Sequence, residues 1–160
     1  MEQTYQTLIG QLLDAAKSAG ASGADAMLAR GQSTSVSIRH GKVESAERSE
    51  DFDIGLRVFV GQQTASISTS QLDADNINDL AARAVAMAKL APEDPYVTLA
   101  SADQLAQQIP MLDIYDPAQP DADSLRQRAS EAEAAALSVD GITNSDGGNA
   151  GHGVVDVLIA

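Results

Sequence analysis

Two histidines, His40 and His152, are the side chains in this sequence best suited to hold a catalytic metal ion. A zinc peptidase needs two imidazoles presented together, usually one helical turn apart, with a third ligand and a carboxylate base. These two lie 112 residues apart, each stands beside a glycine, and the chain contains no cysteine. We therefore place both histidines in solvated turns and predict no metal ligand, no cofactor-binding residue and no catalytic residue in this chain.

Acidic and glycine-rich stretches suggest a calcium loop and a phosphate loop, and both patterns fail. Residues 73–79 approach the calcium-loop pattern, but Ile77 stands where an oxygen ligand is needed and Asn78 where glycine is needed. This stretch is more typical of a capped helix start. Residues 147–153 lack the Gly-Lys-Ser/Thr ending of a phosphate loop, so we predict a flexible connector or a hairpin there. No Gly-x-Ser-x-Gly elbow is present to activate a serine.

Three helices are predicted from apolar residues that recur at steps of three and four. They cover residues 4–19, 74–90 and 122–138. Asp73 is placed to cap the second helix and Asp121 to open the third. The apolar stripe of the third helix is narrow and mostly methyl-sized: Ala122, Leu125, Ala129, Ala132 and Ala136.

Alternation with a period of two replaces the helical period between residues 24 and 69 and predicts short strands. With a last apolar run near the C-terminus, the expected strands are 24–30, 33–39, 42–48, 52–60, 64–69 and 154–159. His40-Gly41 supplies a turn, and connections this short favour an antiparallel meander. We predict an α+β fold in which a mainly antiparallel sheet packs against about three helices.

The charge of the chain disfavours two classes of partner. Its net charge is −13, and residues 71–160 hold fifteen acidic and four basic side chains. Such a field repels phosphate groups, so we expect neither nucleic acid nor a membrane as a partner. No apolar stretch approaches the roughly 20 residues that span a bilayer, and residues 1–4 lack the basic start of a secretory signal. We expect a soluble, cytoplasmic protein.

Several short motifs, taken in their order along the chain, resemble one known family. Residues 23–26, 35–44, 54–61 and 65–70 read GADA, SVSIRHGKVE, IGLRVFVG and ASISTS. In this order they are similar to the N-terminal domain of the TldD/PmbA family, also called modulators of DNA gyrase. The later stretches MAKLAPEDPY, LDIYDP and ITNSDGG are more similar to the PmbA branch, also named TldE, than to TldD.

This resemblance implies a part in a heterodimeric zinc metallopeptidase of TldD and TldE, associated with microcin maturation and antitoxin degradation. The family's metal motif, His-Glu-x-x-x-His, belongs to the C-terminal domain of TldD, and no position of this chain matches it. Zinc is therefore expected only in a TldD-like partner subunit. Residues 1–160 correspond to the N-terminal domain, and we expect the family's C-terminal domain to be absent from this chain.

Three functions remain open from the sequence. The first is a non-catalytic subunit that helps form the subunit interface and the passage for unfolded peptide substrates. The second is a non-enzymatic peptide-binding or scaffold module that needs no peptidase partner. The third, a homodimeric member with its own metal in the missing half, agrees less well with the PmbA-like stretch at residues 92–96.

A possible peptide contact is assigned to Arg57, Ser66 and Ser68. The run from residue 64 to residue 70 carries small hydroxyl side chains on one face, so an extended peptide could add beside it as a further strand. An ordinary solvated strand, or an interior strand with both edges paired, is the alternative. Arg57 could hold a peptide carboxylate or form an internal ion pair. We also expect the apolar strand 154–159 to be exposed and to promote self-association.

Overall fold

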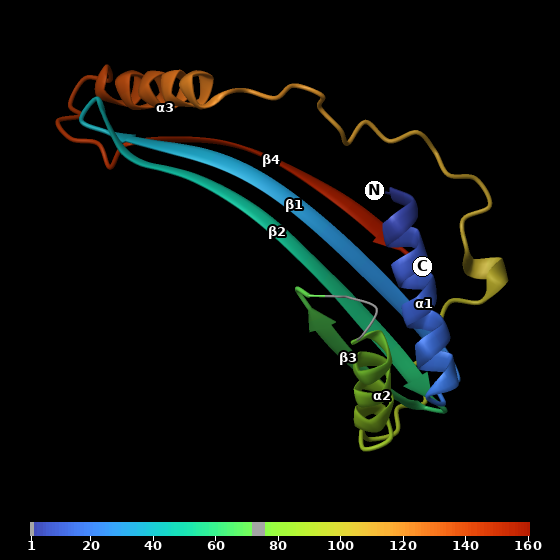
Figure 1. The fold of residues 1–160 in the computed structure, drawn as a ribbon. Helices are drawn as coiled ribbons and strands as arrows, with labels where there is room; N and C mark the ends of the chain where they lie inside the picture. The colour runs from blue at the N-terminus through green and yellow to red at the C-terminus, as the bar shows by residue number, and fades with distance from the viewer. Residues whose placement is uncertain (1, 72–75) are drawn as a thin grey trace. The chain divides into compact units, whose positions relative to one another are not determined.

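The structure is a computed structural model that describes residues 2–71 and 76–160. In chain order, a helix and three strands are followed by a helix, a short 3-10 helix, a helix and a last strand (Figure 1). The elements are α1 (Glu2–Ser18), β1 (Gly23–Arg39), β2 (Lys42–Val60), β3 (Gln63–Thr69), α2 (Ile77–Ala88), η1 (Ala102–Gln104), α3 (Ala122–Leu137) and β4 (Gly148–Ile159). The α+β fold predicted from the sequence is confirmed.

The strands form one antiparallel sheet in the order β3-β2-β1-β4. The predicted turn at His40-Gly41 is confirmed and joins β1 to β2, with φ of 51° at His40 and 71° at Gly41. Positive φ at both central residues is the conformation that matches the twist of two hydrogen-bonded strands. Strand β4 pairs with β1, because Ala26 and Ala160 exchange both of their backbone hydrogen bonds.

Strands β1 and β2 are each longer than predicted. The predicted strands leave gaps at residues 31–32 and 49–51, yet both observed strands continue through these positions. Extended backbone is maintained there because the ladder to a neighbouring strand satisfies its N–H and C=O groups.

The prediction of a flexible connector or hairpin over residues 147–153 is wrong, because Gly148–Ile159 form strand β4. Its glycines allow close packing: a Cβ built on Gly148 would lie 2.1 Å from the carbonyl oxygen of Ala129 in α3. His152 is therefore half-buried within a strand and not in a solvated turn. Glycine is required here by close approach of two backbones, which no local sequence pattern reveals.

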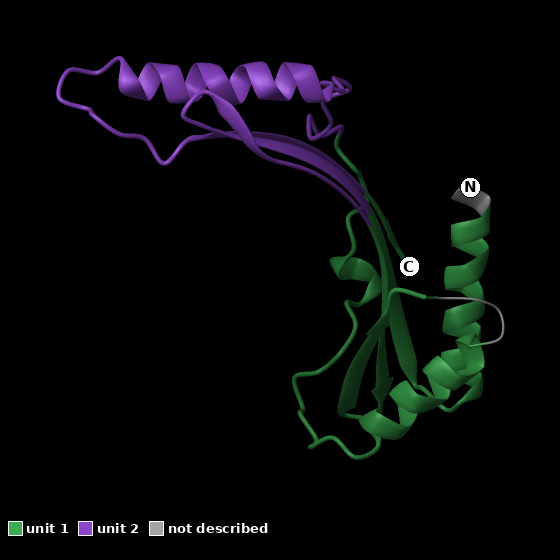
Figure 2. Ribbon diagram, turned by 60° about the vertical axis from the view of Figure 1, so that its left-hand side comes forward, with its two compact units in different colours: residues 1–30, 51–110, 156–160 green, residues 31–50, 111–155 purple. Residues whose placement is uncertain are grey.

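Two compact units divide the chain (Figure 2). The first holds residues 1–30, 51–110 and 156–160, and the second holds residues 31–50 and 111–155. Helices α1 and α2 cover one face of the strands in the first unit. Buried apolar side chains there come from α1, α2, β1 and β2, and they include Ile9, Leu12, Leu28, Ile54, Leu56, Val58, Leu80 and Val85.

In the second unit, α3 packs Leu125 and Ala129 against Val36 and Ile38 of β1. The predicted opening residue of α3 is confirmed, since Asp121 accepts a hydrogen bond from the backbone N–H of Ser124 at 2.8 Å. The predicted stripe is only partly right: Ala122, Ala132 and Ala136 are exposed, and Glu133 takes the third buried position. A step of four residues repeated from Leu125 produces this face.

The three helices lie where the sequence predicts them, and their ends agree within two residues except at the start of α2, which begins three residues later than predicted. The proposed cap Asp73 and residues 74 and 75 fall outside the described residues, and Asn76 stands at the N-cap of α2. Within residues 2–71 and 76–160, no helix is long and apolar enough to cross a membrane.

Candidate functional site

Strand β3 lies at an edge of the sheet. Among the described strands it pairs only with β2, in the register that places Arg57 opposite Ser66 and Gly55 opposite Ser68. The sequence left an edge strand and an interior strand open, and the sheet order places β3 at the edge. Its outer side is therefore a candidate site for strand addition.

The backbone groups of β3 that point outward can be identified from the register. Val60 and Gln63 pair across the two-residue turn Gly61-Gln62, and in such a hairpin the pair next to the turn exchanges its hydrogen bonds. Hydrogen-bonded pairs then alternate along the ladder, so residues 63, 65, 67 and 69 face β2. The N–H and C=O groups of Ser66 and Ser68 point away from β2, toward the open edge.

All three residues predicted to contact a peptide lie around one shallow hollow of about 290 Å³ in the first unit. Arg57, Ser66 and Ser68 line it together with Asp25, Met27 and Gly55. Ser66 and Ser68 are exposed, whereas Ile67 points to the other face and packs against the core. The structure therefore brings the three residues together, and their contact with a peptide stays a prediction.

Arg57 is held by Asp25 in an internal ion pair, which is one of the two roles that the sequence left open. The Nε atom of Arg57 donates to Oδ1 of Asp25 at 3.0 Å, and Nη2 donates to Oδ2. The guanidinium also lies over the ring of Phe59, 5.2 Å from its centre. The hydrogen bonds to Asp25 raise the pKa of Arg57 above its ordinary value. A peptide carboxylate would have to compete with Asp25 for this side chain.

Hydrogen bonds hold both ends of helix α2 beside β3. The side-chain amide of Gln63 donates to the carbonyl oxygens of Ala91 at 2.6 Å and Lys89 at 3.2 Å, just beyond the end of the helix. At the other end, the amide of Asn76 donates to the carbonyl oxygen of Gln71 at 3.1 Å. These contacts fix the helix that flanks the open edge.

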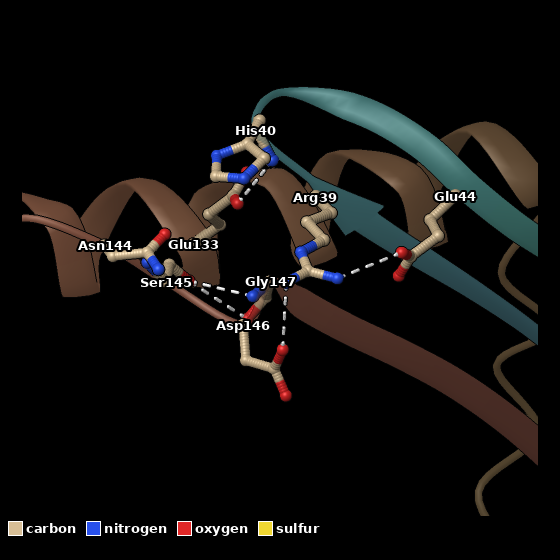
Figure 3. A network of polar contacts seen from close by, with 8 residues as sticks. All are labelled: Arg39, His40, Glu44, Glu133, Asn144, Ser145, Asp146 and Gly147. Atoms are coloured by element: carbon tan, nitrogen blue, oxygen red, sulfur yellow. Dashed lines mark hydrogen bonds and ion pairs between the residues drawn. The ribbon is translucent and has the colours of Figure 1, made fainter.

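A polar network in the second unit contains a residue that the sequence did not reveal (Figure 3). Glu133 of α3 is buried, with 3% of its surface exposed, and its carboxylate accepts hydrogen bonds from the backbone N–H groups of His40 and Gly41. Arg39 lies nearby between Glu44 and Asp146, at 3.5 Å from each. The only sign of this role in the sequence is the four-residue spacing of Leu125, Ala129 and Glu133, which places an acidic residue on the buried face of α3.

Hydrogen bonding keeps the Glu133 carboxylate ionised. The N–H of Gly41 is the largest influence that lowers the pKa of Glu133, and the N–H of His40 and the electrostatic effect of the His40 and Arg39 side chains act in the same direction. Burial opposes them. Both partners are backbone groups of a tight turn, so this carboxylate anchors the hairpin to α3.

No group of three or more His, Asp or Glu side chains that could hold a metal ion occurs in the described part of the chain. His40 lies in the β1–β2 turn and His152 lies in β4. What the geometry offers chemically is an exposed strand edge with outward backbone donors and acceptors.

The sequence of this chain is similar to proteins of one family. Residues 24–88 match the family model described as PmbA/TldA metallopeptidase domain 1. The chain is 35% identical over 147 residues to a metalloprotease PmbA homolog of Haemophilus influenzae, which covers 91% of this chain and 32% of that protein. It is 33% identical over 135 residues to metalloprotease PmbA of Escherichia coli O157:H7, covering 82% of this chain and 30% of that protein.

Two solved structures share the fold. A protein of Bacteroides thetaiotaomicron that carries the name modulator of DNA gyrase superposes with a TM-score of 0.75 at 20% identity, over 96% of this chain and 35% of that one. TldE of Thermococcus kodakarensis superposes with a TM-score of 0.70 at 14% identity, over 96% and 35% of the two chains. The present chain thus spans about a third of the length of the relatives that it matches.

Proposed function

Since its sequence places this chain in the PmbA/TldD metallopeptidase family through the first domain of that family, we propose that it serves a cytoplasmic heterodimeric zinc metallopeptidase as the PmbA/TldE-type subunit. In this proposal a TldD-like partner subunit supplies the zinc and the catalytic residues. The present chain contributes to the subunit interface and guides unfolded peptides, either to be matured or to be degraded, toward that partner.

The open edge of β3 carries this proposal. An added peptide strand receives hydrogen bonds from main-chain groups, so binding makes few demands on the substrate's sequence. This property suits a peptidase that accepts unfolded chains. Ser66 and Ser68 support the arrangement because their small side chains leave the approach of a peptide backbone unhindered.

The test is cleavage of an unfolded peptide by the complex of this chain with a TldD-like subunit from the same organism. Ser68→Pro removes one outward N–H and no N–H that faces β2, a change that an edge strand tolerates. We expect cleavage to slow roughly two- to tenfold, as for one lost hydrogen bond, while complex assembly is retained. Ser68→Ala is the matched control, because it removes the hydroxyl and keeps the N–H. Unchanged cleavage by Ser68→Pro would place the peptide elsewhere.

The open strand edge also suits the alternative of a non-enzymatic peptide-binding or scaffold module. The two functions differ in their dependence on a partner. A scaffold binds peptides at β3 and yields no cleavage with any TldD-like subunit, whereas a peptidase subunit forms a stable complex whose zinc is required for cleavage. Co-purification followed by a cleavage assay with and without a chelator distinguishes them.

A further inference from the structure

A second hollow borders the open edge on the helix-facing side of the sheet. It has a volume of about 600 Å³ and lies between Thr69 of β3 and the exposed stripe of α2 formed by Asp79, Ala82, Arg83 and Ala86. These four residues share one side of the helix, because they occupy the positions i, i+3, i+4 and i+7. Alanine at two of the four positions leaves room between the helix and the strand edge.

The position of this hollow matches the path of an added strand. Thr69 alternates with Ser68, so its side chain lies on the same side of β3 as Ile67, which packs against the helices. Every second side chain of a peptide paired with β3 would point to that side as well, toward α2. The groove therefore combines an edge of backbone donors and acceptors with a helical wall.

Arg83 is the one basic residue of this wall, and it has no ionic partner among the described residues. Arg39, Arg48, Arg57 and Arg126 each form an ion pair within the described residues, whereas no described acidic side chain comes within ion-pair distance of Arg83. Asp79 stands one helical turn away from Arg83 and lines the same hollow without pairing with it. An exposed guanidinium with its fork of donors open is suited to a carboxylate.

We propose that the groove between β3 and α2 selects extended peptides with an acidic side chain facing α2, and that Arg83 binds this side chain through an ion pair. This inference rests on the proposed function, since it requires a peptide on the β3 edge. Complementarity is local: the chain as a whole is strongly acidic, so an acidic residue is favoured only where a cation lies beside the peptide's path. Arg83 occupies that place.

The experiment uses two fluorescein-labelled peptides, Thr-Val-Thr-Glu-Thr-Val and the same sequence with Gln in place of Glu, both with blocked ends. Their Kd values for the 160-residue chain are measured by fluorescence anisotropy. We expect the Glu peptide to bind about two- to fivefold more tightly, which is the range of an exposed ion pair. Arg83→Gln should abolish this preference and leave the Kd of the Gln peptide unchanged. High salt should weaken the preference in the original chain.

Arg126→Gln, which changes an exposed arginine of α3 in the other unit, is the matched control and should keep the preference. A preference for Glu that survives in Arg83→Gln overturns the inference. Ser68→Pro separates this result from the proposed function: it should weaken binding of both peptides equally. If Ser68→Pro weakens binding but Arg83→Gln keeps the preference, the role of Arg83 alone is refuted. If neither peptide binds, or Ser68→Pro has no effect, use of the β3 edge is refuted as well.

Discussion

The carboxylate of Glu133 accepts a hydrogen bond from the backbone N–H of His40 at 2.7 Å, across 93 residues of sequence. Its second oxygen accepts from Gly41 at 2.9 Å, so both central residues of the β1–β2 turn are held by one side chain of α3. A buried carboxylate is tolerated only when such partners compensate for lost hydration. Glu133 and the turn therefore stabilise each other.

Replacing Glu133 by Gln should destabilise the second unit. The amide keeps the size of the side chain, but it replaces one accepting oxygen by an NH2 group that faces a backbone donor, and it removes the charge. We expect a lower thermal midpoint and faster hydrogen exchange at Leu125 and Ala129. Glu131→Gln, at an exposed position of the same helix, should change neither. Equal midpoints for the two variants would contradict the anchoring role of Glu133.

Low pH should weaken the stabilisation that Glu133 gives to the β1–β2 turn. Because the pKa of Glu133 is lower in the folded protein than its ordinary value of 4.5, the stabilisation is fully present above that value. It is lost as the pH falls through the lowered pKa, because the folded state must then take up a proton that it disfavours. Thermal midpoints measured from neutral pH down to about pH 3 should show an acid-side decrease that is smaller in Glu133→Gln. An identical acid-side decrease in both proteins would exclude Glu133 as its source.

The pattern of apolar and polar residues along the chain predicted most of the helices and strands. It predicted fewer of the contacts between residues that are far apart in the sequence. The alternation of Ser66 and Ser68 with Ala65 and Ile67 is a property of neighbouring residues, so it could be read from the sequence. The edge position of β3 depends on the entire sheet order, including the pairing of β4 with β1 near Ala26. Similarly, the partners of Glu133 are distant backbone groups, which residue identity does not specify.

The glycine at position 148 is predicted to be essential for docking α3. A Cβ there would lie 2.1 Å from the carbonyl oxygen of Ala129 and 3.1 Å from the backbone nitrogen of Glu133, so the helix would have to move. We expect Gly148→Ala to lower the free energy of unfolding by about 1–3 kcal/mol, the usual cost of overpacking. Urea denaturation measures this change. Unchanged stability would show that α3 can shift at no cost.

Replacing Gly10 by alanine should stabilise the protein, in contrast to the same replacement at Gly148. It lies in the middle of α1, is exposed, and has nothing within 4 Å of an added Cβ. Gly10→Ala should raise the free energy of unfolding by about 0.5–1 kcal/mol, because alanine restricts the unfolded chain and favours the helix. The same urea titration tests it. A loss of stability would contradict the open environment of Gly10.

Strand β4 forms the other edge of the sheet, and we expect it to promote self-association of this chain. Ala160 exchanges both backbone hydrogen bonds with Ala26, so the ladder alternation directs the N–H and C=O of Val157 and Ile159 away from β1. The side chains at positions 155, 157 and 159 are 63%, 54% and 70% exposed, and Asp156 is the only charged residue of the strand. An apolar edge that lacks Lys and Pro is a template for another strand.

Val157→Lys should therefore reduce association, since a lysine at the edge repels a second strand and resists burial. Sedimentation velocity at increasing protein concentration measures the effect: the original chain should form dimers or larger species, and the variant should remain largely monomeric. Met27→Lys is the matched control, because Met27 is similarly exposed but belongs to β1, which lies between β2 and β4 in the sheet. It should associate like the original chain. If the original chain is monomeric at high concentration, or if both lysine variants lose association equally, the β4 edge is not the contact.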